Sequence, residues 1–197
     1  MTINSRKAEN MEFMFSFGQF IVVWNHIELA ARSILSWLAG DNTAAKILAY
    51  QIGNTSLTDA VRISSDWHPE AKEHLVHFAN MMDTIRAYRN YYVHNLIGIG
   101  KIADTPEPVG LVMALNVRGK FVLHEKALRI ADLDFIANHA DQARQHGLKI
   151  VEILRKNSLA DRIDAFASLE KPDLPKTLEK TVRDLTAPSS PPQSSEA

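Results

Sequence analysis

The chain contains no cysteine, and this absence excludes several kinds of site at once. Disulfide bonds, a thiolate nucleophile and a cysteine-based zinc or iron–sulfur centre are all ruled out. Long hydrophobic runs are also lacking. The N-terminal residues MTINSRKAENMEF do not form the apolar stretch of a signal peptide, and no later segment offers the ~20 apolar residues needed to cross a bilayer. We therefore expect a soluble, cytoplasmic protein.

The chain also has no excess of charge of either sign. Its 22 Lys and Arg residues nearly balance 23 Asp and Glu residues, which gives a formal net charge of -1. The overall electrostatic field therefore predicts no nucleic-acid binding, and any contact with RNA would have to come from a local patch. A length of 197 residues suits one domain with a single core.

What the sequence does contain is helical periodicity. From Glu9 to Leu38 apolar residues recur at alternating steps of four and three, which predicts a long amphipathic helix. Gly40 and Asn42 should end it, because both residues tolerate a left-handed backbone. A bundle core explains this apolar seam as well as a coiled coil does. The seam consists of Phe13, Phe17, Phe20, Trp24, Ile27, Ala31, Ile34 and Leu38.

Capping signals indicate where later helices begin. Ser56 and Asp59 have capping-box spacing, Pro69 suits a first helical turn, and Asp132 can cap a long helix. Between the helix that Pro69 opens and the long helix that Asp132 caps, β-branched residues and turn signals predict a small β-hairpin over about 97–124. The expected helices after the first cover about 43–52, 56–65, 69–95, 132–156 and 158–169.

These elements predict an all-α fold, a helical bundle with a β-hairpin inserted before its last long helix. Residues 1–170 form one helical domain in this interpretation. Residues 171–197 are rich in Pro and Ser and offer little to bury, so we expect a disordered tail.

The densest group of polar and aromatic side chains ends the helix predicted over 69–95. There the segment AYRNYYVHN, residues 87–95, contains Arg89, Asn90 and His94. This arrangement resembles the signature of the HEPN superfamily, an Arg, a polar residue and then a His with four to six residues between Arg and His. The long first helix adds helical context, so the resemblance covers about residues 10–155.

The resemblance implies a helical bundle that acts as a metal-independent endoribonuclease, without a cofactor. HEPN nucleases typically form homodimers, bring two motifs together in one cleft, and cleave RNA by attack of the 2′-hydroxyl. A toxin or defence component, with an antitoxin protein as partner, is the setting that the family suggests.

The residue chemistry is compatible with this activity. The imidazole of His94 can take up or release a proton near neutral pH. Arg89 can hold a phosphate and neutralise charge as it develops, and Asn90 can orient either the phosphate or His94. We expect Arg89, Asn90 and His94 to be catalytic. Residues expected to bind substrate or support the site are Tyr88, Tyr91, Asn95 and Glu28.

Geometry imposes a condition on this site. A step of five residues places Arg89 and His94 about 140° apart around a straight helix. Their side chains converge only if the helix frays before Leu96, if the long Arg reaches round, or if a partner chain contributes. The last option agrees with the dimeric site that the family implies.

Other interpretations stay open. Arg89 and His94 could simply complement the helix dipole while the tyrosines pack, or the same cleft could serve a catalytically silent interaction or ligand-binding module. His74 and His77 have metal-ligand spacing, but the other helices supply no matching ligands, so a solvated helix face is the better interpretation and we expect no metal. Glu28 could pair with Arg89 or lie at the edge of the apolar seam.

Overall fold

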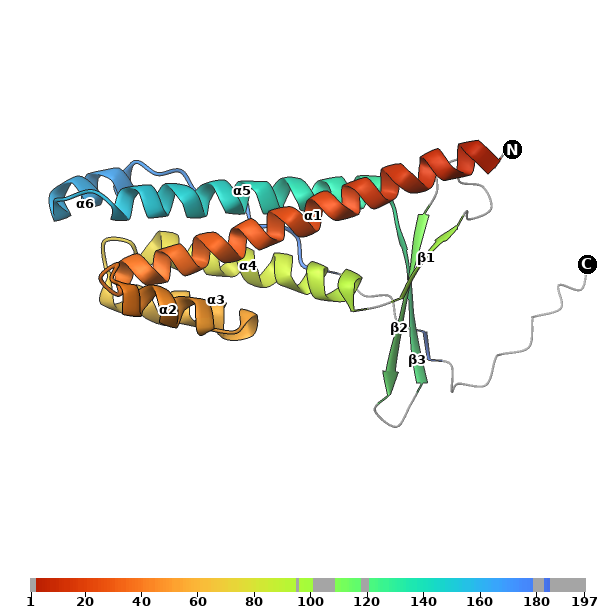
Figure 1. Cartoon of the computed structure of the whole chain (residues 1–197), viewed down its shortest axis with the longest axis horizontal. Coiled ribbons are helices and arrows are strands. Elements are labelled where there is room, and N and C mark those ends of the chain that lie inside the picture. Colours follow the sequence, from red (N-terminus) through yellow and green to blue (C-terminus); the bar gives the residue numbers. More distant parts are fainter. Residues whose placement is uncertain (1–2, 95, 101–108, 118–120, 179–182, 185–197) are drawn as a thin grey trace, which may run out of the picture.

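The computed structural model describes residues 3–94, 96–100, 109–117, 121–178 and 183–184. This part of the chain is mostly helical, which confirms the helical core that the periodicity predicts. The long helices α1 and α5 run along each other, with α2, α3 and α4 on one side of them (Figure 1). The helices are α1 (Ile3–Leu38), α2 (Thr43–Gln51), α3 (Asn54–Ser64), the short 3-10 helix η1 (Ser65–Trp67), α4 (Lys72–Val93), α5 (Ile130–Leu154) and α6 (Leu159–Ala167).

The first helix ends where the sequence predicts. Gly40 and Asp41 have φ angles of 95° and 50°, in the left-handed region. The N–H of Asp41 donates to the carbonyl of Ser36 at 2.8 Å, and the Asn42 side chain accepts from the N–H of Ala45 at 2.9 Å. Asn42 thus caps α2 directly after the left-handed turn.

Three predicted helix starts differ from the structure. α3 begins at Asn54 behind an extended Gly53, so Ser56 lies inside the helix and does not cap it. α4 begins at Lys72, because Pro69 lies in the turn that follows η1. Asp132 is the third residue of α5, where its carboxylate accepts from the N–H of Arg129 at 3.0 Å and satisfies one free helix donor.

Between α4 and α5, where the sequence predicted a β-hairpin, the chain passes through three strands. They form an antiparallel sheet with a short fourth strand, in the order β1-β2-β3-β4, at one end of the helical body (Figure 1). Leu115 in β2 stands opposite Leu123 in β3, and Leu96 in β1 opposite Met113. The strands are β1 (Leu96–Gly100), β2 (Val109–Val117), β3 (Phe121–Leu128) and β4 (Arg183–Asp184).

The apolar seam predicted for the first helix lies in the core of the single chain. Phe20, Ile27 and Ile34 are completely buried. At Gly147, α5 packs closely against both α1 and α4, since an added Cβ would lie 3.1 Å from Cβ of Ala30 in α1 and 2.7 Å from the ring of Phe78 in α4. This seam is therefore not open to a second chain, and the homodimer that the HEPN resemblance implies would need another surface.

The segment after α6 continues along the helical body as an ordered strap, residues 169–178. The Tyr88 hydroxyl donates to the carbonyl of Lys176 at 3.0 Å, Lys171 forms an ion pair with Glu73, and Leu178 is buried. This part of the predicted tail therefore packs against α4. Residues 179–182 and 185–197, which belong to the tail predicted to be disordered, lie outside the described part of the chain.

None of the described helices is both long enough and apolar enough to cross a membrane.

Candidate functional site

The candidate site lies at the carboxyl end of α4. The helix ends at Val93, and His94 follows with φ of -93° and ψ of 0°, outside the helical region. The N–H of His94 still donates to the carbonyl of Asn90 at 3.1 Å, which closes the last turn. This departure from helical geometry lets the His94 ring turn away from the direction that a straight helix would give it.

Arg89 reaches this ring from inside the helix. Its Nη1 atom lies 3.2 Å from Nε2 of His94 and donates to the side-chain oxygen of Asn90, also at 3.2 Å. The three predicted catalytic residues therefore converge within one chain, through a frayed helix end and a long arginine. No partner chain is needed to bring them together.

The hydrogen bond between Arg89 and His94 has a chemical consequence. A guanidinium can only donate, so Nε2 of His94 is the acceptor and carries a lone pair. The imidazole proton is then on Nδ1, in the neutral tautomer. His94 and Asn90 are exposed and Arg89 is partly buried, so the imidazole lies at the surface with its Nε2 lone pair held by a fixed positive charge.

The tyrosines of the motif lie buried beneath this site. Tyr88, Tyr91 and Tyr92 are all at most 8% exposed, and the Tyr92 ring meets the ring of Phe20 in α1 edge-on, with centroids 6.4 Å apart. Burial raises the pKa of Tyr91 and Tyr92 above the ordinary value of a tyrosine. Both hydroxyls therefore stay protonated, and these rings anchor the helix end rather than act as bases.

The structure does not place the other two predicted supporting residues, Glu28 and Asn95, in contact with Arg89. Glu28 lies 3.7 Å from Arg32 on its own helix, and among the described residues no hydrogen bond joins it to Arg89. Asn95 lies outside the described residues.

A second group of side chains, the histidine cluster of His74, His77 and His146, lies between α4 and α5. The His146 ring centroid is 5.4 Å from that of His74 and 5.6 Å from that of His77. His74 donates through Nε2 to the carbonyl of Phe166 at 2.9 Å, and His77 to that of Pro172 at 2.8 Å. The interpretation of His74 as part of a solvated face is wrong, because its side chain holds the segment after α5 in place.

His146 is the member of this cluster that the sequence analysis missed. It is 2% exposed, and neither ring nitrogen has a hydrogen-bond partner among the described residues. Burial, reinforced by the nearby His74 and His77, lowers its pKa to about 4. Its place in the buried stripe of α5, beside Ala143 and Gly147, was the available signal. Among the residues that the structure describes, no group of three or more His, Cys, Asp or Glu side chains is arranged to hold a metal ion.

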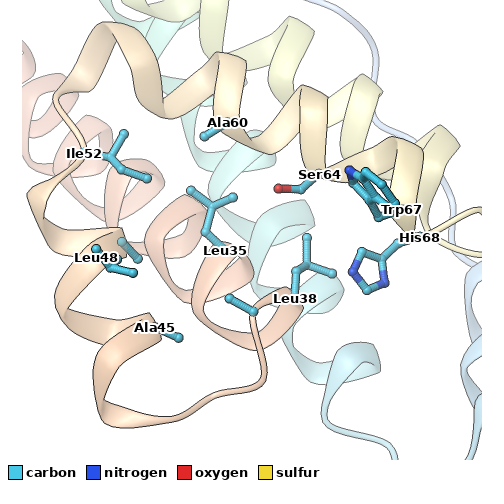
Figure 2. Close-up of a pocket in the computed structure, with 11 residues that line it drawn as sticks. Leu35, Leu38, Ala45, Leu48, Ile52, Ala60, Ser64, Trp67 and His68 are labelled. Atoms are coloured by element: carbon cyan, nitrogen blue, oxygen red, sulfur yellow. The ribbon is translucent and has the colours of Figure 1, made fainter.

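Two hollows lie elsewhere on the surface. One, of about 310 Å³, is enclosed by the end of α1, α2, α3 and η1. Figure 2 shows its leucine and isoleucine lining, with Trp67 and His68 together at one end. The other lies between α1 and α5. Neither includes Arg89 or His94.

Comparison of the chain with models of protein families, with curated proteins and with solved structures finds no match.

Proposed function

We propose that the chain is a HEPN-type endoribonuclease that cleaves RNA without a metal ion, with Arg89 and His94 as its catalytic residues and Asn90 as the residue that positions Arg89. The observation that carries the proposal is the contact between Arg89 and His94. The motif supplies a solvent-exposed imidazole whose Nε2 lone pair accepts a hydrogen bond from a guanidinium 3.2 Å away, and this hydrogen bond has to open before Nε2 can take up a proton from a substrate.

These groups can perform the transfer that the chemistry requires. Once the hydrogen bond from Arg89 has opened, Nε2 of His94 accepts the proton of a 2′-hydroxyl, and the resulting oxygen attacks the adjacent phosphorus. The bond from phosphorus to the 5′-oxygen then breaks. The leaving oxygen takes up a proton from the imidazolium or from water, and a 2′,3′-cyclic phosphate remains.

Arg89 suits the role of phosphate ligand. Its Nη1 is occupied by Asn90 and His94, whereas Nη2 has no hydrogen bond within the described residues and can meet a phosphate oxygen. A guanidinium positioned before the reaction stabilises the charge that builds on the phosphate. Asn90 acts through Arg89 by fixing the direction of its side chain.

The second candidate is a catalytically silent module that binds a ligand or a protein through the same helix end. One feature favours this candidate. Both hydrogen bonds that Nη1 of Arg89 can donate are already made to Asn90 and His94, which is also the arrangement expected if Arg89 only stabilises the end of the helix. The toxin or defence setting and the antitoxin partner rest on the family resemblance alone.

The test that separates these candidates is incubation of purified protein with single-stranded RNA in EDTA, followed by analysis of the product ends. The nuclease reading expects cleavage and 2′,3′-cyclic phosphate ends. Cleavage that EDTA abolishes would replace it with a metal-dependent mechanism. No cleavage across a range of RNA sequences would favour the silent module.

A further inference from the structure

Helix α1 carries a second apolar stripe, separate from the one in the core. Its large members are exposed: Phe15 by 66%, Met11 by 64%, Val22 by 53% and Leu29 by 47%. We call this stripe the outer seam. With Gly18 and Asn25 its residues recur at alternating steps of four and three, the spacing of the a and d positions of a coiled coil.

The outer seam points directly away from the core. At about 100° per residue, Phe20 lies about 180° from the middle of the seam. Phe20 is completely buried, and the packed helices lie on its side of α1. No described part of the chain covers the outer seam, so a long row of large apolar side chains meets solvent.

Gly18 is unexplained within the single chain. A glycine inside a helix weakens it relative to alanine, yet a Cβ added at Gly18 would meet nothing within 4 Å. Nothing in the part of the chain that the structure describes therefore requires a glycine here. A second helix packed on this face of α1 would explain the glycine, because a side chain of that helix could occupy the space above Gly18.

A groove runs beside the outer seam and widens the apolar surface. It has a volume of about 820 Å³, and Met14, Phe15, Gly18 and Val22 contribute to its α1 wall. The α5 wall is more polar and includes Asp141 and Arg144, which pair with each other at 2.7 Å. An apolar centre with a polar edge is the usual pattern of a protein interface.

We infer that the outer seam binds the outer seam of a second copy of this chain, with the two α1 helices antiparallel around a two-fold axis that passes through the interface between Gly18 and Val22. In an antiparallel pair each a position faces a d position. Val22 then sits over the partner's Gly18 and Leu29 against the partner's Met11. Phe15 meets the partner's Asn25. Large residues thus face small or flexible ones in a self-complementary pattern, as a two-fold interface requires.

A polar contact at each end of the pair fits the same register. This register places Glu12 near the partner's His26, so that a carboxylate can accept a hydrogen bond from an imidazole N–H. The contact from residue 11 to residue 29 runs for about 27 Å at 1.5 Å per residue. A parallel pair would instead put Gly18 against the partner's Gly18 and leave a gap where the antiparallel pair has Val22.

This pairing keeps the two candidate sites apart. Tyr92, two residues before His94, packs on Phe20, so the motif lies on the opposite side of α1 from the outer seam. Each copy then holds its own Arg89 and His94, rather than sharing one cleft. The pairing is argued from α1 alone and does not depend on the proposed nuclease activity.

The first test is the mass of the full chain in solution. Light scattering at micromolar concentration should give twice the mass of one chain. Val22→Glu and Gly18→Glu should each halve it. Ile163→Glu, which changes a 49% exposed residue on α6, should leave the dimer intact. A monomeric wild type, or a dimer that survives both α1 variants, overturns the inference.

The second test fixes the direction of pairing and uses the absence of cysteine. Under mild oxidation, chains carrying Met11→Cys should crosslink to chains carrying Leu29→Cys. Neither variant alone should crosslink efficiently. Crosslinking of either single variant to itself, or a dimer without the mixed crosslink, overturns the antiparallel register.

A third measurement separates this inference from the nuclease proposal. If the protein cleaves RNA, the monomeric Val22→Glu variant should retain the wild-type rate, because Arg89 and His94 are complete in each chain. Loss of cleavage together with the dimer would show a shared site and overturn this part of the inference. If no variant cleaves RNA, the nuclease proposal fails while the mass and crosslinking results still decide the pairing.

Discussion

The Nη1 atom of Arg89 lies 3.2 Å from Nε2 of His94, although a straight helix would separate the two residues by about 140°. The end of α4 at Val93 makes this contact geometrically feasible. Because Asn90 accepts the other Nη1 hydrogen bond, its side chain holds the arginine in this orientation.

Asn90→Ala should therefore slow RNA cleavage without abolishing it. Loss of one positioning hydrogen bond of about 1 kcal/mol corresponds to a rate reduction of about 5-fold. Single-turnover kinetics measure this, with Asn138→Ala on α5 as the control. An unchanged rate would show that Arg89 needs no support from Asn90.

The histidine cluster should make stability fall in mild acid. Burial, with His74 and His77 close by, lowers the pKa of His146 to about 4, whereas an unfolded histidine titrates near ~6.5. The stabilisation from neutral His146 is thus complete above pH ~6.5 and is lost as the pH falls towards 4. The positive charges of Lys149 and Lys171 act on the pKa of His146 in the same direction.

The size of this effect is on the order of 2–3 kcal/mol at most. Urea unfolding of the wild type and of His146→Leu at several pH values between 7 and 4 measures it. The wild type should lose more stability than the variant over this range. Parallel pH profiles would contradict the assignment to His146.

The close packing at Gly147 predicts a sensitive position. In Gly147→Ala the new Cβ would lie 2.7 Å from the Phe78 ring and 3.1 Å from Cβ of Ala30. Moving this packed ring should cost about 1–3 kcal/mol, visible as a lower melting temperature. Lys149→Ala, at an exposed position of the same helix, should stay within about 0.5 kcal/mol of the wild type.

The strap after α6 should loosen when its anchor on α4 is removed. Tyr88→Phe deletes the hydrogen bond to the Lys176 carbonyl, worth about 0.5–1.5 kcal/mol. Trypsin should then cut after Lys176 roughly 2- to 10-fold faster, since cleavage tracks the opened population. Tyr50→Phe, at a 61% exposed position, is the control, and equal cleavage of both variants would contradict a holding role for Tyr88.

The sequence predicted those features that depend on local pattern. The period of the apolar residues gave the helical core, and the left-handed preference of Gly40 marked the end of α1. Exact helix starts were harder, because the Ser56 and Asp59 pair matches a capping box equally well inside a helix. Sequence spacing does not show which turn is first.

Features that depend on tertiary contacts could not be read from spacing. The sequence contains two stripes on α1, and only packing shows that the one through Phe20 is buried while the one through Val22 is exposed. His146 lies far from His74 and His77 in the sequence, and the three rings meet only because α4 and α5 pack together. The convergence of Arg89 with His94 likewise depends on a helix end that periodicity alone does not fix.

The proposal of RNA cleavage by Arg89 and His94 is tested most directly by comparing cleavage rates of the wild type, His94→Ala and Arg89→Ala in EDTA, with circular dichroism of each. Wild type should cleave, and both variants should lose about 10²- to 10⁴-fold in rate while keeping the wild-type helical spectrum. Equal degradation of RNA by wild type and His94→Ala would contradict the account, because the activity would then come from something other than this site.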